Sequence, residues 1–536
     1  MAGRGALSQR KRMDCHHPSL KGANMWSWRH LRTRLTTDFP WGAVRSRYYS
    51  SLKSEYDFII VGGGTAGCLL ANRLSSDPSR RVLLVEAGSG SDSLRTRIPI
   101  GYLYCIGNPK TDWMFSTEIE KGLGNRQLTY PRGRVLGGCS AINGMLYLRG
   151  NATDYDRWAK VSGDPSWSWK EVLPLFKAFE DHGVLPSSEY HGYNGEWRVE
   201  KQRLHWDILD AWKNAAVESG IPEIDDFNSG CNEGVSYFHV NQKKGWRWHA
   251  ASAFLSPAIR SRPQLDVISD ATVEKLLLHP QGSRVVGLQL REGQQPGKDS
   301  RRQVNIAGNG QVIMSAGAIG TPHLMQISGI GDPELLSDVG IPCAVPLAGV
   351  GANLQDHLQI RTVFKVKNTK TLNEMSRSWL GRLSMGVEYL LHQSGPLSMA
   401  PSQLGAFSHV ASHPDQSSPN VEYHIQPLSL EKFGAPLHPY PAITASICNL
   451  RPTSRGFVRA TSASIDAPPK IAPHYLSTEE DRVVAADCIR LTRKIMEQRA
   501  LEPFQPSEVK PGPKHVTTEV CFAYVSPETS KCIFLF

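Results

Sequence analysis

The chain has 536 residues, 40% hydrophobic and 21% charged, which is too long for one compact core and predicts two or three folding units. Its net charge of +10 lies almost wholly in residues 1–54, where eleven Lys and Arg face two acidic residues, so no basic surface for nucleic acid is expected elsewhere. No apolar run reaches the roughly 18 residues that cross a bilayer, so any membrane association is expected to be peripheral.

Residues 1–54 are rich in Arg, Ser and Thr and nearly free of acidic side chains, which is typical of a mitochondrial transit peptide. The stretch that begins at Met25 fits this pattern best, and Arg47-Tyr48-Tyr49-Ser50 resembles a matrix-protease site. We therefore predict a leader over 1–54 and a mitochondrial location, in the matrix or at the face of the inner membrane. The alternative is a disordered tail or a mispredicted gene start, which leaves both Met1 and Met25 as candidate start sites.

The ten cysteines are scattered and include no Cys-x-x-Cys pair. Zinc-ribbon sites and redox dithiols need such pairs, so neither is expected and no metal site is predicted. Free, buried thiols in a reducing compartment are the simpler interpretation.

The first predicted element is a buried parallel strand, Asp57–Val61, which leads directly into a Gly-x-Gly-x-x-Gly turn. A helical pattern over 68–74 follows, and then a second strand, Val82–Val85, that ends at Glu86. This order is the dinucleotide-binding fingerprint, in which glycines let the backbone approach a pyrophosphate at a helix N-terminus and the acidic residue accepts the ribose hydroxyls. The predicted cofactor-binding residues of this unit are Gly62, Gly64, Thr65, Ala66, Gly67 and Glu86.

A second glycine-rich segment, Pro131–Gly150, contains Val135-Leu136-Gly137-Gly138-Cys139-Ser140-Ala141-Ile142-Asn143 and is followed by Asp154–Trp158. It resembles the first signature of the glucose–methanol–choline (GMC) oxidoreductases, which indicates FAD. Some relatives attach FAD covalently through a His just before the Asn of this signature. Ile142 occupies that position, so FAD is expected to be bound non-covalently. The resemblance implies that the flavin is lined by Val135, Gly137, Gly138, Asn143, Gly144, Met145 and Leu146.

Further blocks extend the resemblance over residues 56–513, and it lies nearest the choline-dehydrogenase-like branch. Ser315–Gly331 is similar to the second GMC signature, and Gly349–His357 is similar to a later block. Ala271–Val273 resembles the segment whose Val contacts the adenine through its backbone. Val273 is therefore added to the implied cofactor-binding residues.

The resemblance implies an α/β plus α+β fold, with a Rossmann-like, doubly wound FAD-binding domain and a discontinuous substrate domain built on an antiparallel sheet. We expect the FAD-binding domain at 55–160 and 245–357. The substrate domain is expected at 161–244 and 358–510, followed by a divergent tail at 511–536.

The implied activity is that of an FAD-dependent oxidoreductase, a flavoprotein alcohol dehydrogenase that oxidises the CH–OH group of a primary alcohol to an aldehyde by hydride transfer to the flavin. Its partners would be a small alcohol, choline-like or other, and an electron acceptor that is a quinone, a dye or oxygen. Trp246 and Trp248 could contribute an aromatic cage for a quaternary ammonium group, but a role in the core explains them at least as well.

The family's C-terminal segment should carry a His and then a second His or Asn, which would supply the base that removes the hydroxyl proton. Neither is visible in residues 511–536, so no catalytic residue is assigned and the chain is expected to be impaired by loss of that segment. The other histidines considered as a base are His249, His357 and His424. His357, in the turn after Asp356, is a candidate for substrate contact, and the other two fit ordinary core or surface positions.

Two alternatives to an active dehydrogenase remain open. The chain could be a non-catalytic truncated isoform or a pseudoenzyme of the same family, with its C-terminus either a real isoform or a gene-model error. Oxidases and a hydroxynitrile lyase share the fold, and the sequence does not distinguish them from a dehydrogenase.

Overall fold

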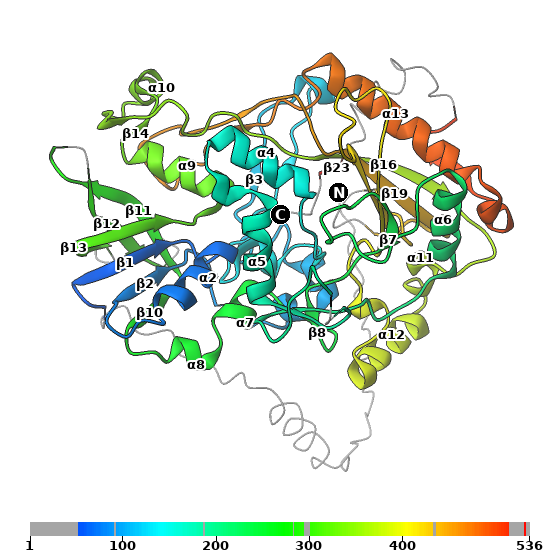
Figure 1. Cartoon of the computed structure of the whole chain (residues 1–536), viewed down its shortest axis with the longest axis horizontal. Helices are drawn as coiled ribbons and strands as arrows, with labels where there is room; N and C mark the ends of the chain where they lie inside the picture. Colours follow the sequence, from blue (N-terminus) through cyan, green and yellow to red (C-terminus); the bar gives the residue numbers. More distant parts are fainter. Residues whose placement is uncertain are drawn as a thin grey trace, which may run out of the picture. The chain divides into compact units, whose positions relative to one another are not determined.

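The computed structural model describes residues 52–90, 93–185, 188–281, 284–293, 301–431, 436–513 and 530–531 (Figure 1). The part of the predicted leader before residue 52 lies outside these residues. Two large sheets organise the described part of the chain. No helix in that part is long and apolar enough to cross a bilayer.

The first large sheet has six strands in the order β10-β2-β1-β13-β12-β11. Four of them, β10, β2, β1 and β13, run parallel, and β12 and β11 extend the sheet in antiparallel fashion. Helix α2 (Thr65–Leu74) follows β1, and α9 (Gly317–Ile327) follows β13. The strands span Glu55–Val61 (β1), Val82–Val85 (β2), Leu265–Ile268 (β10), Ala271–Leu278 (β11), Val285–Glu292 (β12) and Arg301–Met314 (β13).

Strands β1 and β2 are buried because apolar side chains cover both of their faces. Ile59 and Leu83 belong to one core cluster, whereas Ile60 and Leu84 belong to another, and all four are fully buried. Successive side chains of a strand point to opposite faces, so a run without polar residues requires cover on both sides. The carboxyl ends of the parallel strands therefore meet at one edge of a covered sheet, where the glycine turns follow.

The second large sheet is antiparallel, in the order β22-β16-β19-β18-β17-β7, with β23 also paired to β16. Strand β7 (Gly234–Tyr237) comes from a distant part of the chain, so the sheet is assembled from discontinuous segments. The predicted fold class is thereby confirmed. The other strands span Leu358–Lys365 (β16), Leu404–Ser408 (β17), Val421–Gln426 (β18), Ala442–Asn449 (β19), Ser507–Lys510 (β22) and Ser530–Lys531 (β23).

One face of the second sheet is apolar. Ile360, Ile447 and Tyr423 stand next to one another on β16, β19 and β18 and join the core that includes α6 (Asp207–Glu218) and α13 (Glu479–Met496). Figure 1 shows both helices beside this sheet. Because side chains alternate along a strand, the residues before and after these three point to the opposite face.

The remaining elements are shorter. The helices span Leu94–Arg97 (α3), Ala152–Ser162 (α4), Trp169–Phe179 (α5), Ala250–Phe254 (α7), Pro257–Arg260 (α8), Pro333–Asp338 (α10), Leu372–Met375 (α11) and Trp379–His392 (α12), and 3-10 turns include Pro99–Tyr104 (η2), Gly138–Ala141 (η4) and Pro396–Ser398 (η7). The short strands pair as β3 (Phe115–Ser116) with β4 (Thr129–Tyr130), β5 (Glu180–His182) with β6 (Trp197–Val199), β8 (Gln242–Lys243) with β9 (Trp246–Arg247), β14 (Ile330–Gly331) with β15 (Val345–Pro346), and β20 (Phe457–Arg459) with β21 (Lys470–Ala472).

Candidate active site

The turn after β1 forms the first half of the candidate site. Gly62 adopts a φ of +101°, and its N–H donates to the Val85 carbonyl at 2.8 Å, which ties the turn to β2. A Cβ at Gly62 would lie 2.4 Å from the Ser315 carbonyl oxygen, and one at Gly67 would lie 1.9 Å from the Gly62 carbonyl oxygen. These two glycines are therefore required by the turn itself.

Gly64 differs from them, because a Cβ there would meet no atom nearer than 4.0 Å. Its φ of −75° is open to any residue. Gly64 is the N-cap of α2, whose first turn exposes Thr65 and Ala66. Unpaired N–H groups point out of a helix N-terminus, so the open space in front of α2 is a cradle that fits a phosphate group.

The glycines of the second segment lie against this turn. The Gly137 N–H donates to the Gly63 carbonyl at 2.7 Å, and a Cβ at Gly138 would lie 2.7 Å from the Cα of Gly64. Gly137 (φ +98°) and Gly138 (φ +55°) both use the left-handed region. Val135, just before them, is buried. The structure thus brings together two groups of predicted cofactor-binding residues that are far apart in the sequence.

Glu86 holds the same turn from the end of β2. Its carboxylate accepts from the N–H groups of Gly63 at 2.8 Å and Gly88 at 2.7 Å, and its backbone carbonyl accepts from the Ala271 N–H at 3.0 Å. Ala271 begins β11, so the buried Val273, the predicted adenine contact, lies two residues from this corner. Burial raises the pKa of Glu86 to about 7, against the opposing effect of the two N–H groups.

We expect FAD binding to depend on the ionisation of Glu86. A ribose hydroxyl donates more strongly to a carboxylate than to a carboxylic acid, so the bound cofactor favours the charged form. Because the pKa of Glu86 is about 7 before FAD binds, the apparent dissociation constant for FAD should rise about tenfold as the pH falls from about 8 to about 6. Fluorescence titration of the apoprotein with FAD measures this change.

The matched variant is Glu86→Gln, which keeps one acceptor for the two backbone N–H groups that Glu86 holds. It should bind FAD more weakly than the native chain and without the pH dependence. Parallel pH curves for the two proteins would contradict the role of Glu86.

A buried arginine fixes the predicted flavin-lining segment. The Asn143 Oδ1 accepts from the Met145 N–H at 3.0 Å and from the Arg247 guanidinium at 3.1 Å. Arg247 also donates to the carbonyls of Ser140 and Pro99, both at 3.2 Å, and burial lowers its pKa to about 10. The sequence predicts no role for Arg247, because its partners are backbone carbonyls and one side-chain amide, which leave no sequence pattern.

The same segment, Asn143–Leu146, contacts the chain that leads to the second sheet. The Met145 carbonyl accepts from the Asn241 N–H at 2.7 Å. A few residues earlier, the ring centroid of Phe238 lies 5.5 Å from that of His424 on β18. Residues 238–241 therefore contact both the flavin-lining segment and β18.

The second face of the antiparallel sheet is polar although it is buried. Six of its residues, two rows of three, are aligned across β16, β19 and β18 by the strand register, and none is more than 6% exposed. The rows are Gln359, Cys448 and Glu422, and Arg361, Ser446 and His424, which together we call the polar face. The His424 Nε2 lies 3.1 Å from the Glu422 Oε1. A carboxylate, an imidazole and a guanidinium side by side on a buried face can bind a polar group and exchange a proton with it, so the polar face is the candidate for the substrate side of the site.

Of the three histidines considered as a base, His424 alone lies on the polar face. His249 caps α7, its Nδ1 accepting the Ser252 N–H at 3.4 Å, and burial lowers its pKa to about 3. His357 donates from Nε2 to the Leu450 carbonyl at 3.0 Å. His249 and His357 therefore serve local structure.

Among the described residues, two groups of side chains place ligand-type atoms within 4.8 Å of one another, as a metal site requires. The groups are Glu422, His424 and Cys448, on the polar face, and Glu180, His182 and His191. In the second group both nitrogens of His191 already bond carboxylates, Glu180 at 3.0 Å and Asp226 at 2.9 Å. The Nδ1 of His182 accepts from the Leu185 N–H at 2.9 Å. We therefore assign the second group a structural role.

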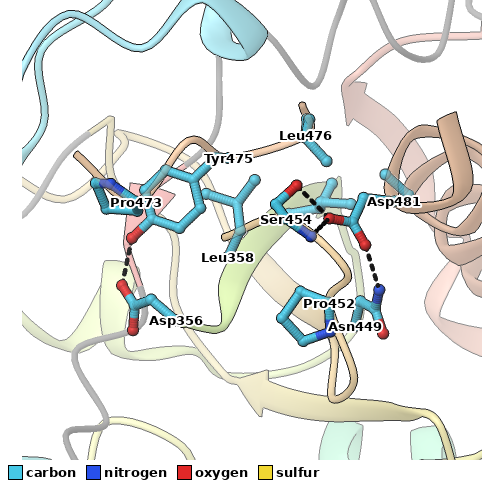
Figure 2. A pocket seen from close by; sticks show the side chains of 11 residues that line it. Asp356, Leu358, Asn449, Pro452, Ser454, Pro473, Tyr475, Leu476 and Asp481 are labelled. Atoms are coloured by element: carbon cyan, nitrogen blue, oxygen red, sulfur yellow. Dashed lines mark hydrogen bonds between the residues drawn. The ribbon is translucent and has the colours of Figure 1, made fainter. Parts of the chain in front are cut away.

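A cavity of about 30 Å³ lies beside the turn that precedes β16. Figure 2 shows Asp356 accepting from Tyr475 at one end of it, and Asp481 accepting from Ser454 and Asn449 at the other. This volume suits a water molecule and is far below the roughly 300 Å³ of the smallest ordinary ligand sites. The lining of this cavity comes mainly from β16, α13 and the loops around Asp356 and Tyr475, and it includes no residue of the polar face.

The chain matches the GMC oxidoreductase family in two parts, residues 56–359 and 452–530. It is 37% identical over 459 residues to the Pseudomonas putida protein named alcohol dehydrogenase (acceptor), covering 85% of this chain and 81% of that protein. It is 35% identical over 477 residues to mitochondrial choline dehydrogenase of Homo sapiens, covering 88% and 78%. Pyridoxine 4-oxidase from Mesorbium loti has a similar structure, with a TM-score of 0.76 at 28% identity, covering 89% of this chain and 87% of that one.

The expectation that the chain lacks the C-terminal family segment is wrong. The second match extends to residue 530, past Pro511-Gly512. Within the described part of this segment, β23 pairs with Leu358 and Gln359 of β16, and so extends the edge pairing that β22, just before the segment, makes with Val363–Lys365. The expectation relied on one short histidine motif, whereas the family match covers the segment as a whole.

Proposed function

The chain belongs to the GMC oxidoreductase family and is an FAD-dependent oxidoreductase acting on alcohols, and from this premise we propose that it oxidises a primary alcohol to the aldehyde by hydride transfer to the flavin. The observation that carries the proposal is the position of the polar face, which adjoins the flavin-lining segment through Phe238. FAD, when bound, supplies the hydride acceptor.

The residues of the first half fit FAD. The open space at Gly64 would take the pyrophosphate at the start of α2, and Glu86 would accept the ribose hydroxyls. Val273 would contact the adenine from the start of β11. The segment Asn143–Leu146, held by Arg247, would form the wall beside the ring system.

On the polar face we propose His424 as the base that removes the hydroxyl proton. An imidazole suits this step because its ordinary pKa is close to neutral. Glu422, whose Oε1 lies 3.1 Å from the His424 Nε2, would stabilise the positive charge that His424 acquires with the proton. Both side chains are buried, so bulk water does not compete for the proton at His424.

The charges of the polar face favour an uncharged alcohol. Arg361 stands in the same cross-strand row as His424, and its positive charge offsets that of Glu422 in the next row. A quaternary ammonium group calls for an aromatic cage or an uncompensated carboxylate. We therefore propose a neutral primary alcohol as substrate and choline as the comparison.

The test is anaerobic reduction of the FAD-loaded protein by a panel of primary alcohols that includes choline. The flavin absorbance should bleach, fastest with uncharged alcohols, and should recover on addition of a quinone or dye. An oxygen electrode distinguishes a dehydrogenase from an oxidase. If no alcohol bleaches the flavin, the non-catalytic alternative is favoured.

We expect the flavin to be released completely by acid precipitation. Ile142 occupies the position from which some relatives attach FAD, and this buried side chain has no nucleophilic atom. Absorbance spectra of the supernatant and the redissolved pellet measure the two fractions. Flavin that stays with the polypeptide would show a covalent link elsewhere.

A further inference from the structure

Helix α12 (Trp379–His392) carries a stripe of exposed apolar side chains. They are 45% to 72% exposed, and they are Trp379, Leu380, Leu383, Val387, Leu390 and Leu391. At about 100° per residue these positions fill an arc of about 120° around the helix, and no polar residue of α12 falls inside that arc. A continuous apolar surface of this kind marks an interaction site.

The opposite side of α12 is fixed to the protein. Met385 and Tyr389 are buried there. The Tyr389 hydroxyl donates to the Gly245 carbonyl at 3.0 Å, and its ring centroid lies 5.7 Å from that of Trp246. The helix is therefore already anchored by its buried side, and the stripe has no role in that packing.

The charges around the stripe are mainly positive. Arg377 and Arg382 are exposed at the N-terminal end, near the exposed Glu374 of α11. Glu388, the acidic residue within α12, is half-buried and accepts from the Ser394 hydroxyl at 3.2 Å. At the C-terminal end, the exposed Lys244 precedes Gly245, which lies against Gln393 at the end of the helix. Both ends of the stripe thus present cations.

We propose that α12 docks the protein on a bilayer surface that contains anionic lipids. An amphipathic helix with Trp and Leu on one face and basic residues beside it lies in the membrane interface, with its apolar side chains below the headgroups. The cations at its two ends would then meet anionic headgroups. A second copy of the chain fits less well, because two-fold pairing through α12 would set basic ends against basic ends.

The test is co-sedimentation of the full FAD-loaded chain with phosphatidylcholine vesicles, with and without phosphatidylserine. Binding should be stronger with phosphatidylserine and should weaken as salt is added. The variant Leu383→Ser/Leu390→Ser should bind about tenfold more weakly or worse, with unchanged flavin content, because both side chains are exposed.

The matched control is Leu175→Ser, since Leu175 is a 64% exposed leucine on α5. It should bind vesicles like the native chain. All three proteins carry the basic residues 1–54, so binding through that segment is common to them. Equal binding by the native chain and the double variant would overturn the proposal. The proposal would also be overturned if light scattering showed that the native chain is a dimer and the double variant a monomer, and if the native dimer bound no vesicles.

Discussion

Gly64→Val should abolish retention of FAD while the chain still folds. A Cβ at Gly64 would meet no protein atom nearer than 4.0 Å, and its φ of −75° is open to valine. The valine side chain would instead fill the space in front of α2, where the pyrophosphate approaches the backbone. We expect the FAD dissociation constant to rise about 100-fold or more, which corresponds to about 2.7 kcal/mol.

Variants of two other glycines serve as controls that distinguish loss of FAD from loss of the folded state. Gly349 is exposed, and a Cβ there would meet no atom within 4 Å, so Gly349→Val should keep both flavin and stability. Gly67→Val should unfold the turn, because even a Cβ there lies 1.9 Å from the Gly62 carbonyl oxygen. The flavin-to-protein absorbance ratio and the melting temperature of the apoprotein distinguish the three variants. A native flavin content in Gly64→Val would show that the open space in front of α2 does not hold the pyrophosphate.

His424→Ala should lower kcat by about 10²–10⁴-fold with little change in flavin content, because general base catalysis contributes this much. His424 lies on the polar face and not in the cradle, so removing it should spare the cofactor. Stopped-flow measurement of flavin reduction by the best alcohol isolates the step. Added imidazole should restore part of the rate, which a merely structural defect would not allow.

Two further variants test whether the effect belongs to this histidine. Glu422→Gln should lower the rate less than His424→Ala, since it removes a negative charge 3.1 Å from the ring but leaves the base in place. His357→Asn should cost stability, because His357 bonds the Leu450 carbonyl, but should leave kcat near the native value. A large loss in His357→Asn with native turnover in His424→Ala would reverse the assignment.

The predicted loss of the C-terminal segment was wrong because it was inferred from a missing histidine motif. A histidine motif is a short local feature, and its absence does not imply that the whole segment is absent. Among the described residues, the contribution of this segment to the fold is edge pairing, in which β23 bonds Leu358 and Gln359 of β16. Backbone pairing depends weakly on side-chain identity, so a strand can keep its place in a sheet when the motif near it is not recognisable.

The sequence by itself predicted the residues of the proposed FAD cradle, because each of its two parts is a continuous motif, the strand–turn–helix–strand unit 57–86 and one glycine-rich segment. The packing of Gly137 and Gly138 against Gly63 and Gly64 was decided by the tertiary structure. The tertiary structure alone decided the polar face, whose members come from three strands and meet only through sheet register. The alternating Glu422, His424 and Gln426 of β18 are typical of a strand with one side in solvent. Burial of that side is a property of the assembled molecule, and it changes these polar side chains from a solvated surface into a candidate site for an alcohol.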